Sequence, residues 1–235
     1  MSRLHARRQF IAAGLSIALA VPVAAIAAPT AVAGEQGDSN FVLLKRGSEG
    51  PRVKLVQRTL DVKTVNGNYN RVTRNHVKRF QDSRSIEVTG VVNERTMKGI
   101  RAKWENIQDA RKRWNAKYDR ILRIARAQKG DPYRYGAAGP TAFDCSGLTM
   151  FVYRKATNMN LEHRATSQFR KGDRISRKQA RPGDLVFMYD GGGIYHAAIY
   201  AGRGDIIHAS TPGTNVKRDP IWTNNVLFAR MFKKP

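Results

Sequence analysis

The sequence predicts an α+β fold, in which helices in the first part of the chain are followed by an antiparallel sheet. Two observations carry this prediction. Apolar residues of the first part recur at helical spacing between glycine-rich turns. From about residue 181 onward, short apolar runs follow one another, with Pro-Gly or glycine-rich turns between them. Helices followed by consecutive short strands are typical of α+β proteins with an antiparallel sheet.

The charge of the chain indicates the class of its partners. The 235 residues include 42 Lys and Arg but only 18 Asp and Glu, which gives a net charge of +24. Such a chain is expected to bind polyanions, namely nucleic acid, anionic lipid or anionic cell-wall polymers. The basic residues are spread from Lys45 to Lys234 without a dense tract. This spread favours a broadly positive surface over a dedicated nucleic-acid-binding arm.

Residues 1–33 have the pattern of a secretory signal peptide. Arginines at positions 3, 7 and 8 precede an apolar run over 10–28, and small residues lead to an expected cleavage site after Ala33. Arg7-Arg8 also resembles the twin-arginine signal, so the Sec and twin-arginine routes both stay open. An uncleaved anchor is the alternative, and Gly14 and Pro22 within the run disfavour it. We expect a secreted or cell-wall protein without stable membrane insertion after cleavage.

Residues 41–103 predict a small domain of three helices. Turns rich in glycine and asparagine separate segments whose apolar residues recur every three or four positions, and Asn93 is suited to cap the third helix. The apolar positions are Val53, Val56, Leu60, Val77, Phe80, Met97 and Ile100. About 60 residues are enough for an independent domain, although a small one.

Spaced residues in this unit carry a family resemblance. They are Leu44, Gly47-Ser48-Glu49-Gly50, Gln57, Asn66-Gly67, Tyr69, Thr73, Phe80-Gln81, Gly90 and Thr96. The pattern resembles the peptidoglycan-binding domain that is common in cell-wall hydrolases, and it departs at Asn70, where that family usually has glycine. The resemblance implies that residues 41–103 bind peptidoglycan. A helical unit that only packs against its neighbour is the alternative.

Residues 104–117 predict a helical connector to a second domain over 118–235. Charged residues are dense here, and Trp104 and Trp114 lie on one apolar helical face that continues into the second domain. The helix is expected to stop at Gly130-Asp131-Pro132. Two tryptophans in a basic helix suit nucleic-acid stacking, but a packed stripe with a solvated charged back is favoured. We therefore expect no nucleic-acid partner.

Cys145 is the only cysteine of the chain. A loop over 136–140 rich in glycine leads to Asp144, and an apolar run begins at Leu148. Asp144 is therefore expected to cap a helix that has Cys145 in its first turn. Free N–H groups and the helix dipole at this position predict a thiol pKa below its usual value of about 8.5. A small buried cysteine of the core is the alternative.

Two histidines follow in strand-like apolar runs, His196 within 195–200 and His208 within 205–209. Neighbouring antiparallel strands are able to place both on one face. A thiol, a base and a group that orients the base form an arrangement for nucleophilic catalysis. The alternatives are two core histidines, or a zinc site of Cys145, His196 and His208. The helix-start cysteine disfavours zinc, and we expect neither a metal nor another cofactor.

Several stretches between 118 and 235 match a second family. The matching residues are Pro132-Tyr133, Gly136, Phe143-Asp144-Cys145-Ser146-Gly147-Leu148, Pro182-Gly183-Asp184-Leu185-Val186-Phe187, His196, Ile199-Tyr200 and Ile207-His208-Ala209. Together they resemble the NlpC-like cell-wall cysteine peptidases, a permuted branch of the papain-like fold. The resemblance implies a papain-like catalytic domain with an antiparallel sheet.

The same resemblance implies the roles of individual residues. Cys145 is expected to be the nucleophile, His196 its general base and His208 the residue that orients His196. The residues that match Tyr133, Asp144 and Ser146 help to hold substrate in that family. The sequence departs from the family around His163, where Leu161-Glu162-His163-Arg164 replaces a common Leu-Pro-Arg. We interpret His163 as a surface or groove residue.

These expectations combine into a secreted peptidoglycan hydrolase that acts as a monomeric thiol endopeptidase on stem peptides. The resemblance implies cleavage of the bond from γ-D-glutamyl to the diamino acid. An amidase that cuts between N-acetylmuramic acid and L-alanine is the alternative within the enzymes. A non-catalytic wall-binding protein is the alternative from another class, and intact Cys145, His196 and His208 argue against it. The expected partners are peptidoglycan and anionic wall polymers.

Overall fold

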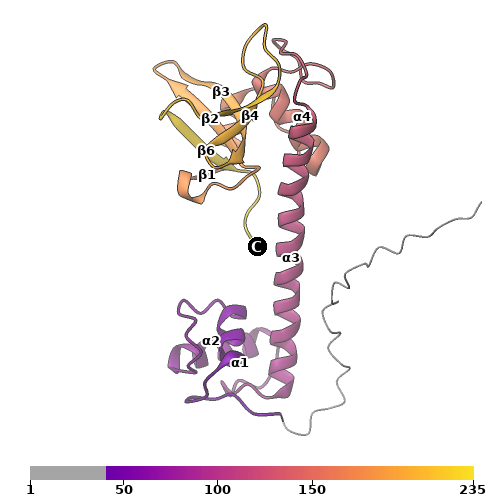
Figure 1. Ribbon diagram of the computed structural model, residues 1–235. Helices are drawn as coiled ribbons and strands as arrows, with labels where there is room; N and C mark the ends of the chain where they lie inside the picture. The colour runs from indigo at the N-terminus through magenta and orange to yellow at the C-terminus, as the bar shows by residue number, and fades with distance from the viewer. Residues whose placement is uncertain (1–40) are drawn as a thin grey trace, which may run out of the picture. The chain divides into compact units, whose positions relative to one another are not determined.

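The computed structural model describes residues 41–235, so the predicted signal peptide lies outside the described residues. The helices are α1 (Pro51–Thr59), α2 (Arg71–Ser83), α3 (Glu94–Ala127), α4 (Cys145–Thr157) and α5 (Ala165–Lys171), with a 3₁₀ turn over Arg177–Gln179. The strands, which the reader can follow in Figure 1, are β1 (Asp173–Ile175), β2 (Leu185–Asp190), β3 (Gly193–Gly202), β4 (Asp205–His208), β5 (Lys217–Pro220) and β6 (Val226–Arg230). The predicted α+β class is confirmed.

Two similar clusters of polar residues hold the helices α1, α2 and the start of α3 around their turns. The Gln57 side chain is buried, accepts a hydrogen bond from the backbone of Gly67 (2.8 Å) and donates to Thr73 (3.2 Å). Gln81 is buried in the same way and bonds Gly90 (2.8 Å) and Thr96 (3.2 Å). Buried amides need such partners, so these glutamines fix the turns that precede α2 and α3.

Asparagine caps begin both of the later helices in this part of the chain. Asn70 accepts a hydrogen bond from the backbone of Thr73, and Asn93 accepts one from Thr96. Both caps satisfy N–H groups that a helix leaves free at its start. Asn70, the position at which the sequence departs from the peptidoglycan-binding pattern, is therefore the N-cap of α2.

Helix α3 is longer than any single helix expected from the sequence. Its 34 residues include the predicted third helix, the predicted connector over 104–117 and the first helix of the predicted second domain. The helix ends at Ala127, close to the predicted stop. Its C-terminal part contributes Ile121, Leu122 and Ala125 to a hydrophobic core shared with α4 and the sheet.

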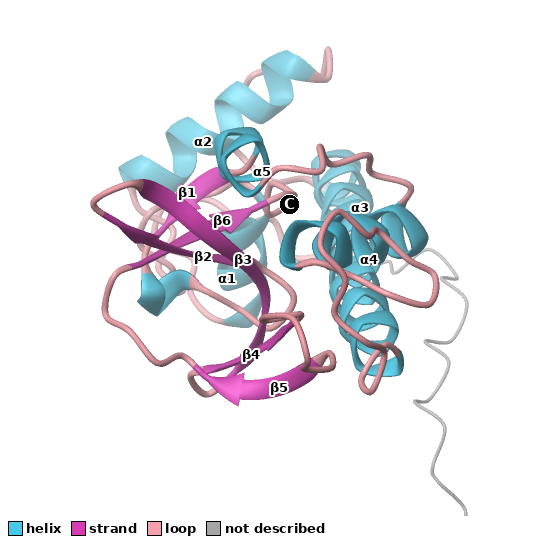
Figure 2. Ribbon diagram, turned by 90° about the horizontal axis from the view of Figure 1, so that it is seen from above, coloured by secondary structure: helices cyan, strands magenta, loops and turns pink. Residues whose placement is uncertain are grey.

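A six-stranded antiparallel sheet forms the other side of that core. The strand order is β1-β6-β2-β3-β4-β5, and each neighbouring pair is antiparallel. Helices α3 and α4 lie next to each other on one side of the sheet, and α4 packs on β3 (Figure 2). The centre of the sheet is buried: Leu185, Phe187, Ala197 and Ile199 have no exposed surface. This sheet positions the two histidines.

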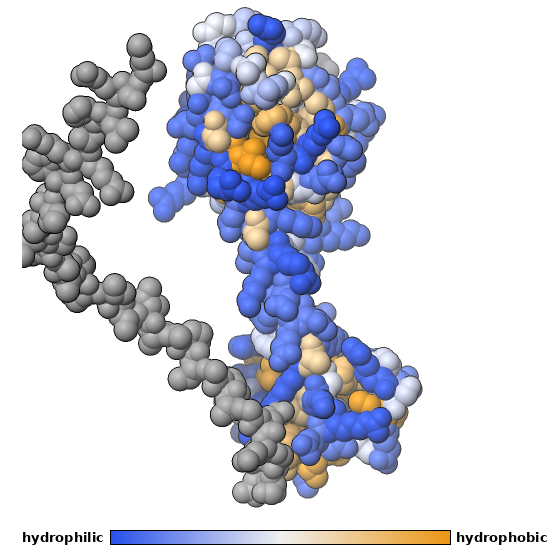
Figure 3. Space-filling model, turned by 90° about the vertical axis from the view of Figure 1, so that its right-hand side faces the viewer, coloured by the Kyte–Doolittle hydropathy of each residue, from blue (hydrophilic) through white to orange (hydrophobic). Residues whose placement is uncertain are grey.

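The molecular surface agrees with the charge of the sequence. Hydrophilic side chains dominate the face drawn in Figure 3. Within residues 41–235, no helix is both long and apolar enough to cross a membrane.

Candidate active site

Cys145 is the first residue of α4, and Asp144 caps this helix as expected. The Asp144 carboxylate accepts hydrogen bonds from the backbone of Gly147 (2.7 Å) and Gly136 (3.0 Å) and from the Ser146 hydroxyl (3.2 Å). One carboxylate thus binds both the first turn of α4 and the glycine-rich loop before it. Cys145 is thereby held between the loop and the helix.

Gly147 allows this loop to approach the helix closely. A Cβ atom at Gly147 would lie 2.1 Å from the carbonyl oxygen of Ala137 and 2.9 Å from Nε2 of His163. Such contacts leave no room for a side chain. Glycine in the Asp-Cys-Ser-Gly segment is therefore a steric requirement of the site.

The protonation of Cys145 differs from the sequence-based expectation. Burial raises the thiol pKa above its usual value, and the neighbouring Asp144 carboxylate raises it further. Hydrogen bonds from the backbone of Ala197, Ser146 and Cys145 itself act in the opposite direction but do not outweigh burial. The prediction of a lowered pKa was wrong, because the helix terminus that favours a thiolate is also packed out of water.

His196 and His208 form a buried pair, and the residue after His196 lies against Cys145. His196 Nε2 lies 2.9 Å from His208 Nδ1, and the ring planes are nearly perpendicular at 89°. Only 5% of His196 and 1% of His208 is exposed. The Ala197 backbone that follows His196 hydrogen-bonds the Cys145 thiol, which ties β3 to the start of α4.

A bulge in the sheet precedes His196. His196 pairs with Met188, but Ile194 pairs with the next residue, Tyr189, so Tyr195 is the extra residue of β3. Bulges change the direction of nearby side chains and are frequent next to active sites. His208 is the last residue of β4 and pairs with Lys217 on β5.

Both imidazoles are held in the neutral form. Burial and, to a smaller extent, the neighbouring His208 lower the pKa of His196 to about 3. Burial also lowers the pKa of His208, where a hydrogen bond from the ring to Asp219 opposes the shift. The resting site therefore contains a neutral thiol and two neutral rings near pH 7.

The hydrogen-bonded pair continues to residues that the sequence did not single out. His208 Nε2 lies 3.1 Å from Oδ2 of Asp219, and the same oxygen lies 2.9 Å from the Lys217 ammonium group. The Trp222 ring covers the pair, with its centroid 5.2 Å from that of His208 and 5.6 Å from that of His196. Asp219 and Trp222 lie in a segment where apolar and polar residues do not alternate, so no strand was predicted there.

The remaining expected substrate-binding residues lie around Cys145. Ser146 is buried in the first turn of α4. Tyr133 pairs with Phe143 in an isolated bridge, so it lies beside the segment that leads into Asp144 and Cys145, and burial raises the pKa of its hydroxyl. His163 contacts both Asp144 carboxylate oxygens at 2.8 Å. The structure thus brings Tyr133, Asp144 and Ser146 to the same end of α4 as Cys145.

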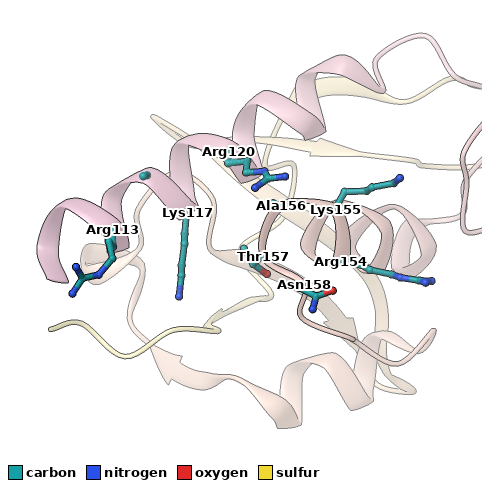
Figure 4. A pocket seen from close by; sticks show the side chains of 9 residues that line it. Arg113, Lys117, Arg120, Arg154, Lys155, Ala156, Thr157 and Asn158 are labelled. Carbon is teal, nitrogen blue, oxygen red and sulfur yellow. The ribbon is translucent and has the colours of Figure 1, made fainter. Parts of the chain in front are cut away.

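A second feature lies away from these residues. A groove of about 630 Å³ runs between α3 and the C-terminal end of α4. Figure 4 shows Arg113 and Lys117 extending from the same side of α3. The lining residues are Arg113, Ala116, Lys117, Arg120, Arg154, Lys155, Ala156, Thr157 and Asn158, five of them cationic and none acidic. Within residues 41–235, no cluster of three or more His, Cys, Asp or Glu side chains is suited to hold a metal ion.

Comparison with known proteins identifies relatives of both parts of the chain. A probable endopeptidase p60 of Listeria monocytogenes is 48% identical over 100 residues, which cover 42% of this chain and 20% of that protein. A probable endopeptidase of Corynebacterium glutamicum is 37% identical over 94 residues, or 40% of this chain and 44% of that protein. The chain thus spans about a fifth of the length of the Listeria relative and less than half of the other.

Among solved structures, the NlpC/p60 domain of the peptidoglycan hydrolase SagA is 37% identical and has a TM-score of 0.46. The match covers 48% of this chain and 98% of that domain. Residues 130–231 match the NlpC/P60 family, and residues 49–99 match the peptidoglycan binding domain family. The chain therefore carries a C-terminal domain of the NlpC/P60 family behind an N-terminal domain of the peptidoglycan-binding family.

Proposed function

We propose that this protein is an exported peptidoglycan endopeptidase that cleaves stem peptides through Cys145. The observation that supports it most is the start of α4, where the thiol meets the β3 backbone next to the buried His196–His208 pair. In this proposal Cys145 is the nucleophile, His196 the general base and His208 the residue that orients His196. Tyr133, Asp144 and Ser146 hold the substrate.

The neutral resting state defines how the reaction starts. The Cys145 sulfur attacks the peptide carbonyl carbon while His196 takes the thiol proton, so charge separates only as the bond forms. In this proposal the Cys145 backbone N–H stabilises the resulting oxyanion. The His196 imidazolium then returns the proton to the leaving amine, and the C–N bond breaks. Water, deprotonated by His196, hydrolyses the thioester and restores the thiol.

The bond cleaved is the one from γ-D-glutamyl to the diamino acid in this proposal, as the family resemblance implies. Mass spectrometry of fragments released from purified sacculi tests it. Wild type should release peptides that begin with the diamino acid and leave a dipeptide that ends in D-glutamate on muramic acid, whereas Cys145→Ala should release none. Iodoacetamide should inactivate wild type, and a chelator should not.

Other outcomes of that experiment are decisive. Free stem peptides that begin with L-alanine would indicate the amidase instead. Wild type that sediments with sacculi but releases nothing would indicate a non-catalytic wall-binding protein. Loss of activity with chelator that zinc reverses would contradict the thiol mechanism.

We also infer that the N-terminal domain and the basic groove act together in wall attachment. The peptidoglycan-binding family match covers residues 49–99, so this domain is the proposed peptidoglycan contact. The groove presents five cations from α3 and α4 without an acidic neighbour in its lining. Charge complementarity favours a linear phosphodiester polymer of the cell wall as its occupant.

A further inference from the structure

A chain of hydrogen bonds leaves the proposed catalytic site through the two histidines and ends at the protein surface. It runs from His196 Nε2 to His208 Nδ1 (2.9 Å), and from His208 Nε2 to Asp219 Oδ2 (3.1 Å). We propose that Asp219 is a positioning residue that sets the tautomer of both imidazoles and so leaves Nδ1 of His196 as the basic atom. This inference rests on the function proposed above, in which His196 is the general base.

The argument begins at Asp219, whose charge Lys217 maintains. The Lys217 ammonium group lies 2.9 Å from the same carboxylate oxygen that faces His208. Burial alone would raise the pKa of Asp219, but hydrogen bonds from Lys217 and His208 outweigh it and lower the pKa. An ionised carboxylate only accepts hydrogen bonds. Nε2 of His208 must therefore carry the hydrogen atom.

The hydrogen on Nε2 of His208 determines which nitrogen of His196 carries a hydrogen. A neutral imidazole has one N–H donor and one acceptor nitrogen. With its hydrogen on Nε2, His208 presents Nδ1 as an acceptor toward His196. His196 must then donate from Nε2, and its own acceptor is Nδ1. Both rings are buried and their pKa values are lowered, so the neutral forms are the ones to consider.

Without a carboxylate at Asp219, the opposite arrangement becomes accessible. His208 is then able to carry its hydrogen on Nδ1 and donate it to Nε2 of His196. In that state His196 carries its hydrogen on Nδ1 and has no lone pair available there to take the thiol proton. The His196–His208 contact would be unchanged in length, and only the direction of the hydrogen bond would differ. A change of tautomer is therefore separable from a change of structure.

The surroundings of the pair restrict ring motion but do not choose a tautomer. Trp222 packs against both rings and presents ring atoms to them at centroid distances of 5.2 and 5.6 Å. Stacking of this kind limits rotation and is indifferent to which nitrogen carries hydrogen. The Lys217 ammonium group contacts Asp219, and its charge also lowers the pKa of His208.

The same pair of strands provides a matched control. Asp205 on β4 forms an ion pair with Arg218 on β5 at 2.8 Å. Its side chain is 31% exposed, the same fraction as that of Asp219. Partly exposed ion pairs of this kind contribute little to stability. Asp219→Asn and Asp205→Asn should therefore have similar, small effects on folding and different effects on the histidines.

The experiment compares turnover of soluble stem peptides by wild type, Asp219→Asn, Asp219→Ala and Asp205→Asn. Loss of the correct tautomer costs about 10⁴-fold where a buried carboxylate contacts the base itself. Asp219 is partly exposed and contacts His208 instead of the proposed base His196. We therefore expect a smaller loss than that, about 10- to 100-fold in kcat, with KM little changed. Asp205→Asn should stay within about twofold of wild type. Equal turnover of Asp219→Asn, Asp219→Ala and wild type would overturn the inference.

A spectroscopic measurement tests the tautomers without substrate. Long-range ¹H–¹⁵N spectra of ¹⁵N-histidine-labelled protein distinguish Nδ1–H from Nε2–H rings, and His→Gln variants assign the five histidines of the chain. Wild type and Asp205→Asn should show His196 and His208 in the Nε2–H form, and Asp219→Ala should show a mixture. An Nδ1–H form of His208 in wild type would overturn the inference. Because this readout needs no hydrolysis, it holds even if the protein fails to cleave peptidoglycan.

Discussion

The burial of the two histidines, which the proposed mechanism uses, has a cost in folding. His196 has a pKa of about 3 in the folded protein, because burial and His208 disfavour its charged form. In an unfolded chain a histidine titrates near 6.5. Between these two pH values the unfolded state binds the proton and the folded state does not. Stability therefore falls as the pH drops below about 6.5.

His196→Gln should weaken this acid sensitivity. We expect wild type to lose up to a few kcal/mol of unfolding free energy between pH 6.5 and pH 4 from this group. The variant should lose distinctly less over the same range. Urea unfolding followed by circular dichroism at several pH values measures this, with His76→Gln on α2 as the control. Identical pH dependence in wild type and His196→Gln would show that His196 is protonated in the folded protein.

At the level of elements, α3 contacts the C-terminal part of the chain already at Trp114, before residue 118. Trp114 lies within the predicted connector, but its indole N–H donates to the Phe232 carbonyl oxygen (3.3 Å). The Arg181 guanidinium lies 4.0 Å from its ring centroid, and Tyr118 packs against its edge. We propose that the catalytic domain begins before Trp114 and not at Tyr118.

Trp114→Ala should therefore destabilise the catalytic domain. Loss of a packed tryptophan costs about 3–5 kcal/mol when it is fully buried. Trp114 is only partly buried, so we expect the substitution to lower the free energy of unfolding by about 2 kcal/mol. The Tm of the C-terminal domain, measured as the temperature at which activity is lost, should fall as well. Trp104→Ala, ten residues earlier on α3, is the control and should leave that transition in place. Equal effects of the two substitutions would contradict this proposal and support a connector over 104–117 that belongs to neither domain.

The helices and strands that were predicted correctly are those marked by a local pattern, either a capping residue or an apolar run. Asn93 and Asp144 were predicted as caps and are caps, and the apolar runs at β2, β3, β4 and β6 were predicted as strands. The edge strands β1 and β5 were missed. β5 reads Lys-Arg-Asp-Pro, and its extended form depends on pairing with β4 instead of on its own residues.

The residues of the candidate site likewise fall into those that local patterns predicted and those that they did not. Cys145, His196 and His208 were predicted because each stands in a recognisable local pattern. Asp219 and Trp222 reach the histidines only through the pairing of β5 with β4 and the segment after it, which no local pattern encodes. The raised pKa of Cys145 likewise depends on packing between α4 and β3. Contacts between distant segments are what sequence periodicity cannot supply.

For the whole molecule, the excess of basic over acidic residues is expected to make the proposed wall attachment dependent on salt. The basic groove concentrates part of this charge between α3 and α4. Peptidoglycan recognition by the N-terminal domain and polyanion binding by the groove should respond differently to ionic strength, because only the second depends chiefly on charge.

Arg113→Glu combined with Arg120→Glu should weaken adhesion to walls that retain their anionic polymers. We expect a loss of about tenfold at low salt and little loss on walls stripped of those polymers. Arg123→Glu with Arg126→Glu makes the same charge change on exposed α3 residues outside the groove, so it is the control. Sedimentation at several salt concentrations measures the effect. Equal losses in both variants would assign adhesion to total charge, and binding of nucleic acid in preference to wall polymer would contradict the proposed occupant.

The single cysteine allows the site to be labelled without any substitution in the chain. Since the chain has no other cysteine and Cys145 stands at the first turn of α4, a fluorophore that reacts with thiols attaches at one position only. The number of labels per molecule then counts competent sites in any preparation. Protection from labelling by a stem-peptide analogue measures occupancy, and no residue has to be replaced to install the probe.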